Sequence, residues 1–258
     1  DMAGMAVEAR AAYVAAVAAS LVRVGRVPEA AQLADREGLA LLQRVADRAP
    51  AATQSACYAV FAEVFLLCGR CSEGAVFARI AGDYADDADD SSRFRALAVS
   101  GAAHALNGEF DQALRQMDAA SSTDAGRRWT ESSWPWVLAA SVIAHRQGDA
   151  ASIEAALASL ATAGSKDVVA RAVVKVCHLW LEGAREDFRE LIVRARSVVH
   201  GVDRAVCPPF FVDLAASMEC LALIQLGDPA AALRTIEGRR SPAGHSVCFG
   251  LLRAPETK

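Results

Sequence analysis

A recurring glycine is the sequence feature that most limits how this chain can fold. Each of six glycines follows an apolar run with helical spacing, and they stand at positions 25, 69, 108, 148, 183 and 227. Glycine is the usual residue just past a helix end, where the backbone turns left-handed. The intervals of 44, 39, 40, 35 and 44 residues are typical of repeated helix pairs. Because one pair cannot bury its apolar face alone, we predict an array of six stacked helix pairs.

The residue five positions after each glycine supports this register. These residues are Ala30, Gly74, Ala113, Ile153, Phe188 and Ala232. Four of the six are small, as close contact between the two helices of a pair requires. Asp149 and Asp228, each directly after a turn glycine, are good helix N-caps. The larger Ile153 and Phe188 predict second helices that sit further out in the fourth and fifth pairs.

The boundaries of the pairs follow from the same register. We place them at 4–48, 52–87, 91–122, 132–163, 167–200 and 209–238. Polar composition predicts loops at 83–92, 121–128 and 201–209. The repeat domain is predicted to span 1–240. Residues 241–258 contain two prolines and no clear period, and we interpret them as a C-terminal tail or cap.

Composition favours an all-α fold in the cytoplasm. Hydrophobic residues make up 53% of the chain and aromatic residues only 6%, so the apolar mass is mostly Ala, Val and Leu. The net charge of -4 gives no electrostatic reason to expect nucleic-acid binding. The sequence has no apolar run of membrane-spanning length and no secretory start. Seven scattered cysteines, an odd number, favour reduced thiols and a cytoplasmic location.

One segment resembles a known repeat. Gly101, Gly108, Phe110, Ala113 and Ala120 fall in the spacing of the tetratricopeptide repeat, a helix-turn-helix unit of thirty-four residues. The resemblance implies a right-handed α-solenoid of about six such pairs. In that family the first helices line a concave surface that binds partner proteins, which implies a scaffold or adaptor role.

The longer, irregular, Ala- and Arg-rich repeats also resemble the helical-repeat segment of large LuxR-family, MalT-like bacterial regulators. This second resemblance implies a sensing or coupling segment of a transcriptional regulator. The nucleotidase module and the DNA-binding module of those regulators are not visible in this sequence.

The candidate metal motifs have structural interpretations. Cys68 and Cys71 have the C-x-x-C spacing of a zinc or redox site, but no second matching pair occurs, and they flank a repeat glycine. A calcium loop that starts at Asp87 would need Gly at position 92 and Glu at position 98, where the chain has Ser92 and Ala98. We therefore expect no metal ion and no cofactor, and we expect the last acid of the run or Ser91 to cap the next helix.

The catalytic motifs of hydrolases, zinc proteases and P-loop nucleotidases do not occur in the sequence. We therefore predict that the chain is not an enzyme and has no catalytic residues. The five histidines are spread along the chain, and His104 and His145 come near the ends of first helices.

The predicted binding surface is the concave face. Its candidate partner-binding residues are Arg95, Leu138, Val142, His145, Trp180, Leu221 and Ile224. This mostly apolar lining favours an amphipathic helix or apolar peptide as the partner. The lining is equally compatible with a tight superhelix filled by its own side chains, with the functional surface elsewhere.

Trp134-Pro135-Trp136 is the densest aromatic cluster, and we include Trp134 and Trp136 among the candidate partner-binding residues. The alternative is that they hold the preceding loop against a neighbouring helix.

Three hypotheses of function remain. The first is a non-catalytic protein-interaction module, which does not bind nucleic acid or membrane and which can self-associate. The alternative is a small-molecule receptor that encloses an apolar ligand in a closed superhelix. A helical-repeat RNA binder is disfavoured by the acidic charge.

Overall fold

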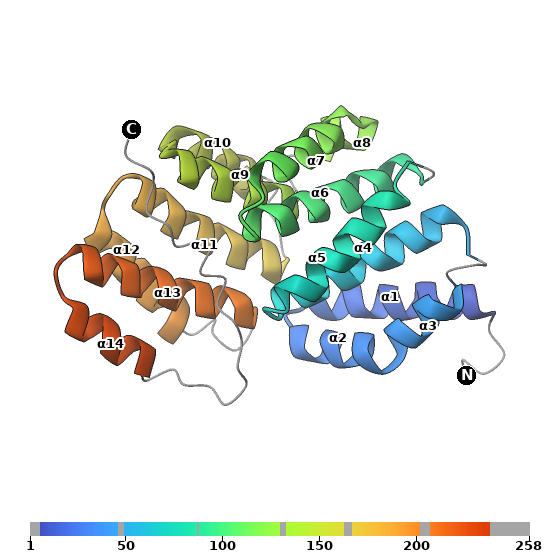
Figure 1. Cartoon of the computed structure of the whole chain (residues 1–258), viewed down its shortest axis with the longest axis horizontal. Coiled ribbons are helices and arrows are strands. Elements are labelled where there is room, and N and C mark those ends of the chain that lie inside the picture. The colour runs from blue at the N-terminus through green and yellow to red at the C-terminus, as the bar shows by residue number, and fades with distance from the viewer. Residues whose placement is uncertain are drawn as a thin grey trace.

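The computed structural model describes residues 6–45, 49–86, 88–129, 133–162, 167–201 and 207–237 (Figure 1). Within these ranges the regular secondary structure is helical and contains no strand, so the prediction of an all-α fold is confirmed. Within the same ranges, no helix combines the length and apolar character needed to cross a bilayer. The predicted tail at 241–258 lies outside the described residues.

The helices follow the predicted pairs to within a few residues. The first helices are α1 (Val7–Arg23), α4 (Ala51–Leu67), α6 (Asp90–Leu106), α9 (Trp134–Gln147), α11 (Val168–Ala184) and α13 (Pro209–Gln225). The second helices are α2 (Val27–Leu33), continued by the π-helical η1 (Ala34–Gly38) and α3 (Leu39–Val45), then α5 (Cys71–Asp83), α7 (Phe110–Ser122), α10 (Ala150–Thr162), α12 (Phe188–His200) and α14 (Pro229–Glu237).

Every first helix ends in the same left-handed turn. The residues with positive φ are Gly25, Gly69, Gly108, Gly148, Glu186 and Gly227. After each, the next backbone N–H donates to a carbonyl five residues back, as Arg26 does to Leu21 at 2.8 Å. These bonds satisfy carbonyls that the helix end leaves without a partner. The same geometry at Glu186, where the Asp187 N–H donates to the Glu182 carbonyl at 3.0 Å, makes Glu186 the turn residue of the fifth pair.

The predicted turn at Gly183 is therefore wrong. Gly183 lies inside α11, three residues before the turn. With Glu186 in its place, the six turns are 44, 39, 40, 38 and 41 residues apart, a more regular series than the glycines alone provide. The residue five positions after the turn becomes Leu191, which is buried, instead of Phe188.

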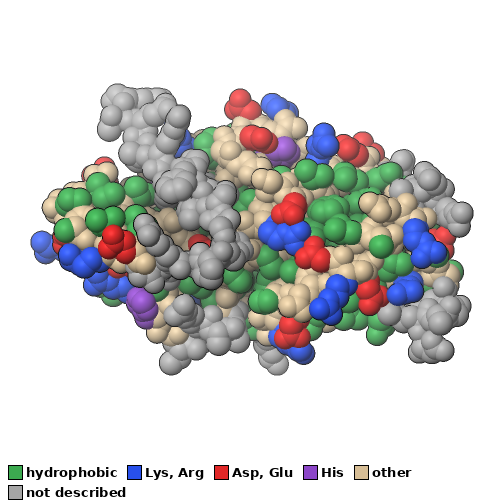
Figure 2. Space-filling model, turned by 60° about the horizontal axis from the view of Figure 1, so that its bottom comes forward, with side chains coloured by type: hydrophobic (Ala, Val, Ile, Leu, Met, Phe, Trp, Pro, Cys, Tyr) green, Lys and Arg blue, Asp and Glu red, His purple; other side chains and the backbone are tan. Residues whose placement is uncertain are grey.

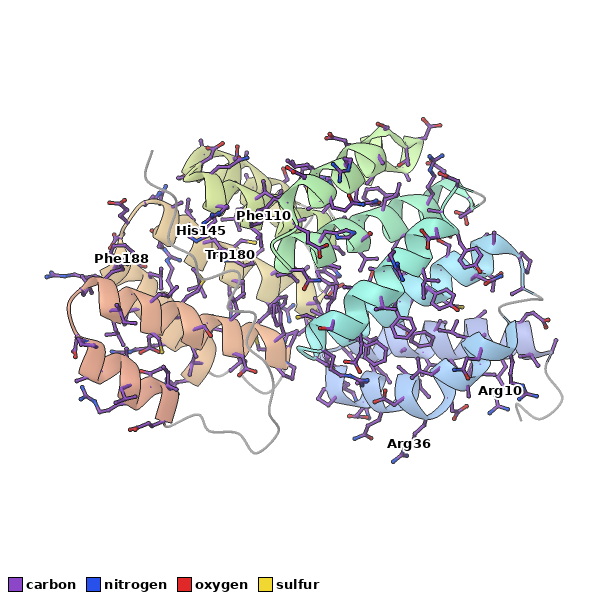
Figure 3. All side chains as sticks on the ribbon, in the orientation of Figure 1. Arg10, Arg36, Phe110, His145, Trp180 and Phe188 are labelled. Atoms are coloured by element: carbon purple, nitrogen blue, oxygen red, sulfur yellow. The ribbon has the colours of Figure 1, made fainter. Side chains whose placement is uncertain are left out.

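Gly183 is instead needed for the contact between α9 and α11. A Cβ atom at this position would lie 2.9 Å from the Cε1 atom of His145. The His145 Nδ1 atom lies 3.0 Å from the carbonyl oxygen of Trp180 on α11. Figure 3 shows His145 and Trp180 next to each other on these neighbouring helices. A side chain at 183 would displace the imidazole from this hydrogen bond.

Successive pairs pack through both of their helices. Each first helix contacts the next first helix, and from α4 onward it also contacts the second helix of the preceding pair. The row of pairs curves back on itself, because α1 contacts α11 and α4 contacts α13 (Figure 1).

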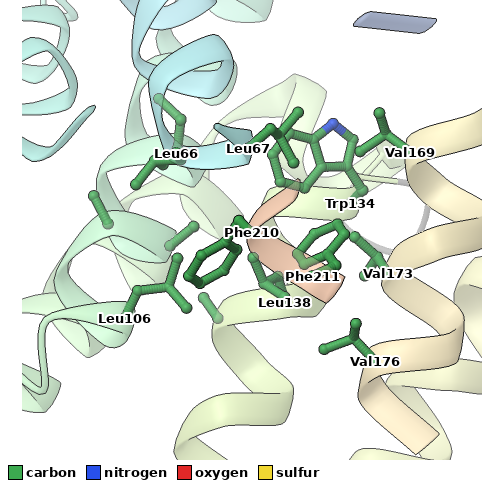
Figure 4. Close-up of a cluster of buried hydrophobic side chains, with 14 of the residues drawn as sticks. Leu66, Leu67, Leu106, Trp134, Leu138, Val169, Val173, Val176, Phe210 and Phe211 are labelled. Carbon is green, nitrogen blue, oxygen red and sulfur yellow. The ribbon is translucent and has the colours of Figure 1, made fainter. Parts of the chain in front are cut away.

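The first turn of α13 fills the middle of this curve. Phe210 and Phe211 are buried, with ring centroids 5.6 Å apart. Figure 4 shows them among apolar side chains from four other helices. The labelled neighbours are Leu66, Leu67, Leu106, Trp134, Leu138, Val169, Val173 and Val176. Two aromatic rings from one helix thus join the cores of pairs that are distant in the sequence.

Acidic residues between the second and third pairs cap two helices. The Asp89 carboxylate accepts hydrogen bonds from the backbone N–H groups of Ser91 and Ser92, both at 3.1 Å, and caps α6. The prediction that the last acid of the run, Asp90, or Ser91 caps this helix is wrong, because the capping carboxylate belongs to the preceding residue, Asp89. Asp90 accepts from the N–H groups of Asp124 and Ala125, at the start of the short helix α8 (Asp124–Trp129).

The predicted loop at 121–128 is wrong, because α7 continues to Ser122 and α8 follows directly. The helix start of α8 is stabilised by a carboxylate 34 residues earlier in the chain. The polar composition of residues 121–128 therefore did not indicate that a helix begins there.

We predict that Glu186→Gly stabilises the fold. A residue other than glycine in the left-handed region costs about 1 kcal/mol or more, so glycine should raise the free energy of unfolding by about 1 kcal/mol. Urea denaturation of the wild type, Glu186→Gly and Glu186→Ala measures this. Equal stability of the glycine and alanine variants would contradict a left-handed backbone at this position.

We predict that Gly183→Ala lowers the free energy of unfolding by about 1–3 kcal/mol, because the added methyl group overpacks the α9–α11 contact. Gly82→Ala is the matched control: it also lies in a helix, and its Cβ would lie 4.0 Å from the nearest atom, the Ser100 hydroxyl. The control should be neutral or slightly stabilising, since alanine favours helix. Similar losses in both variants would exclude the proposed contact.

Candidate protein-binding surface

Four of the nine candidate partner-binding residues lie in the core. Trp134, Leu138, Val142 and Trp180 are all buried. Trp134 and Leu138 belong to the central cluster around Phe210 and Phe211 (Figure 4). These four buried side chains are not accessible to a partner, so they are not part of a binding surface.

Arg95 is engaged within the chain. Its guanidinium donates two hydrogen bonds to the carboxylate of Glu63, with Nε–Oε1 at 2.8 Å and Nη2–Oε2 at 2.7 Å. Glu63 is buried on α4, so this bidentate pair compensates the charge of a buried carboxylate. The guanidinium therefore links α4 to α6.

Trp136 and His145 are half-buried on α9. Burial lowers the pKa of His145, the hydrogen bond to the Trp180 carbonyl raises it, and the nearby charge of Arg146 lowers it further. The net effect is a lowered pKa, so the imidazole is neutral at pH 7 and its Nδ1–H donates to that carbonyl.

Leu221 and Ile224 lie on a different part of the molecule from the other predicted residues. They belong to α13 of the last pair, where Leu221 is half-buried and Ile224 is 51% exposed. Leu233 and Ile236 on α14 are each 55% exposed. We call these four side chains the end face. Figure 2 shows hydrophobic side chains among charged ones at the left end of the molecule, where α13 and α14 lie.

The position of Ile236 in the repeat shows why its exposure is unusual. It stands nine residues after the turn residue of its pair. The five residues at this position in the preceding pairs are all buried: Ala34, Ala78, Met117, Leu157 and Ala195. Each of those five pairs is followed by another pair, whereas no helix follows α14 among the described residues.

Ile224 behaves in the same way on the first helix. It stands three residues before the turn, where Val22, Leu66 and Ala105 are buried and His145 and Gly183 are half-buried. Ile224 and Ile236 therefore stand where a following pair covers the surface elsewhere in the chain. The position of Leu233 does not distinguish the last pair, since Leu114 and Glu154 are exposed there in the third and fourth pairs.

Leu233 and Ile236 were missed by the sequence analysis, which considered only first helices as binding surface. The available signal was the apolar residue nine positions after the turn in all six pairs, together with the end of the helical pattern after α14.

The two thiols of the C-x-x-C motif, Cys68 and Cys71, are buried. Burial raises the pKa of Cys68 to about 11, a neighbouring arginine and aspartate having smaller, opposed effects. The Cys68 thiol is therefore protonated at neutral pH, whereas zinc binds the thiolate. Within the described residues, no group of three or more His, Cys, Asp or Glu side chains is arranged to hold a metal ion.

A surface hollow of about 510 Å³ lies beside the turn between α6 and α7. It is lined by His104, Gly108, Glu109, Phe110, Asp111, Gln112 and Arg115. The Nδ1 atom of His104 lies 2.5 Å from a carboxylate oxygen of Glu109, so these two groups bind each other. Five of these seven residues are polar or charged, and the hollow is open to solvent, so it does not match an enclosed apolar ligand.

Comparisons of the chain with protein families, curated proteins and solved structures found no match. The resemblance to tetratricopeptide repeats therefore rests on the residue spacing in this chain, and the candidate surface rests on its own geometry.

We predict that acidification destabilises the fold partly through His145. An unfolded histidine has a pKa near 6.5 and the folded His145 has a lower one, so the unfolded state binds more protons. The free energy of unfolding should thus fall as the pH drops below about 6.5. His145→Gln should lose less stability than the wild type between pH 7 and 5, and parallel curves would refute this role. His178, whose pKa burial also lowers, is retained in both proteins.

Proposed function

We propose that this chain is a non-catalytic protein-interaction module, built as a right-handed tetratricopeptide-like solenoid, that binds an amphipathic helix on its end face. The observation that carries the proposal is that Ile224 and Ile236 are exposed at repeat positions that preceding pairs bury or partly bury. This apolar surface is complementary to a helix that packs against α13 and α14 in the way that the first helix of a following pair packs elsewhere.

The internal junctions indicate which helix fits. Every first helix after α1 buries two residues that stand nine and five positions before its turn residue. These pairs are Val60 and Val64, Val99 and Ala103, Ala139 and Ile143, Cys177 and Leu181, and Met218 and Ala222. A third residue, three positions earlier, is buried or half-buried in each helix. The expected partner helix therefore carries small or medium apolar side chains at i, i+3 and i+7.

The size of the apolar contribution follows from the exposed side chains. Complete burial of an isoleucine side chain contributes about 1.5–3 kcal/mol, and Ile224 and Ile236 each retain about half of their surface for burial. Each therefore contributes about 1 kcal/mol to binding. Because each isoleucine contributes so little, stable binding needs the whole end face.

The proposal extends to the cellular role implied by the sequence. In a LuxR-type regulator, a module of this kind would provide sensing or self-association. The small-molecule alternative lacks comparable support, since the hollow beside the turn between α6 and α7 is open to solvent and is not an enclosed apolar cavity.

Site-specific photo-crosslinking tests the proposed surface. A photoreactive phenylalanine analogue at position 224 should crosslink, in lysate of the source organism, to a helical segment with apolar residues at i, i+3 and i+7. The same analogue at position 193 is the control, since Val193 on α12 is 62% exposed and lies outside the end face. Adding Ile236→Asp should abolish the crosslink from position 224. Equal crosslinking from both positions, or no crosslink at all, would contradict the proposal.

A further inference from the structure

The first pair, at the opposite end of the row from α14, also exposes side chains at positions that are covered in the later pairs. On α1, Tyr13 is 51% exposed, and Ala16 and Ser20 are also exposed. They stand twelve, nine and five residues before the turn at Gly25. We call these three side chains the start face.

The same positions are covered in every later first helix. Nine and five residues before the turn, all ten side chains from α4 to α13 are buried. Twelve residues before the turn, Cys57, Ala96 and Ala215 are buried, and Trp136 and Val174 are half-buried. The start face is thus the surface that a preceding pair covers elsewhere in the chain.

We infer that the chain associates head to tail, with the start face of one copy docked on the end face of another. The inference rests on the proposed function of the end face and names its partner. Within the described residues, no helix pair precedes α1 or follows α14, and the contact would continue the stacking of pairs that α4 to α13 already show.

The start face has the spacing that the end face requires, although Tyr13 is larger and Ser20 is polar; the equivalent of Tyr13 on α9 is the aromatic Trp136. Tyr13, Ala16 and Ser20 have the spacing i, i+3 and i+7. The Ser20 hydroxyl donates to the Ala16 carbonyl at 2.8 Å, so it needs no water or partner when the face is covered. Two small residues allow the close approach of helix backbones, and the Tyr13 ring adds apolar area at one end.

The two faces differ, so the contact is heterologous. Such contacts form closed rings when the rotation between copies closes, and open chains when it does not. Each copy has one start face and one end face, and an interface of this type therefore does not stop at a dimer unless the ring has two members.

Sedimentation velocity at increasing concentration tests the inference with three variants. The end-face variant is Ile224→Asp with Ile236→Asp, and the start-face variant is Tyr13→Asp with Ala16→Arg. The control is Val193→Asp. All substitute exposed side chains, and circular dichroism and melting curves confirm that each is folded.

The wild type and the control should form larger species as concentration rises, whereas each double variant alone should remain monomeric. Mixing the two double variants should restore a one-to-one dimer that does not grow further, because one intact junction remains. This complementation does not occur for an interface that uses the same surface on both copies.

A wild type that stays monomeric, a double variant that still associates, or a mixture that forms no dimer would each overturn the inference. These results leave the proposed function separate: crosslinking from position 224 to a different protein would support binding by the end face even if the chain does not self-associate.

Discussion

The structure depends on one backbone constraint, the left-handed residue that ends each first helix. In six places this residue reverses the chain so that the following N–H closes on a carbonyl five residues back. The residue five positions after the turn then packs against the first helix, whether it is Ala30, Ile153 or Leu191. Because the turn sets the geometry of every pair, the pairs can stack with the same register. The left-handed backbone conformation is a property of single residues, but it sets the orientation of the helices in all six pairs.

Stacking then determines which surfaces remain for binding. The pairs curve until α4 meets α13, and the rings of Phe210 and Phe211 occupy the middle. Side chains that would line an open groove, such as Leu138 and Trp180, become core. The apolar positions without a neighbouring pair are at the two ends of the row. The proposed interaction surfaces therefore lie at the two ends of the row.

The sequence supported the helix boundaries well, because turn glycines and N-caps such as Asp149 and Asp228 act within a few residues. Predictions from the sequence were wrong where contacts between residues distant in the chain determine the local structure. Gly183 resembles a turn glycine, but it lies within α11 and makes room for His145. Glu186 is the turn residue although its type does not favour a positive φ. The start of α8 depends on Asp90, which is distant in the sequence.

The sequence by itself determined that the chain is helical, where most of the helices begin and end, and that five of the six turns use glycine. These properties follow from local backbone preferences and from the period of apolar residues. Only the tertiary structure decided which apolar residues are core and which are surface. Ile236 and Ala195 occupy equivalent positions in their pairs, yet one is exposed and the other is buried. The difference arises because burial depends on whether another pair packs against that position, and an apolar residue has the same local pattern in both cases.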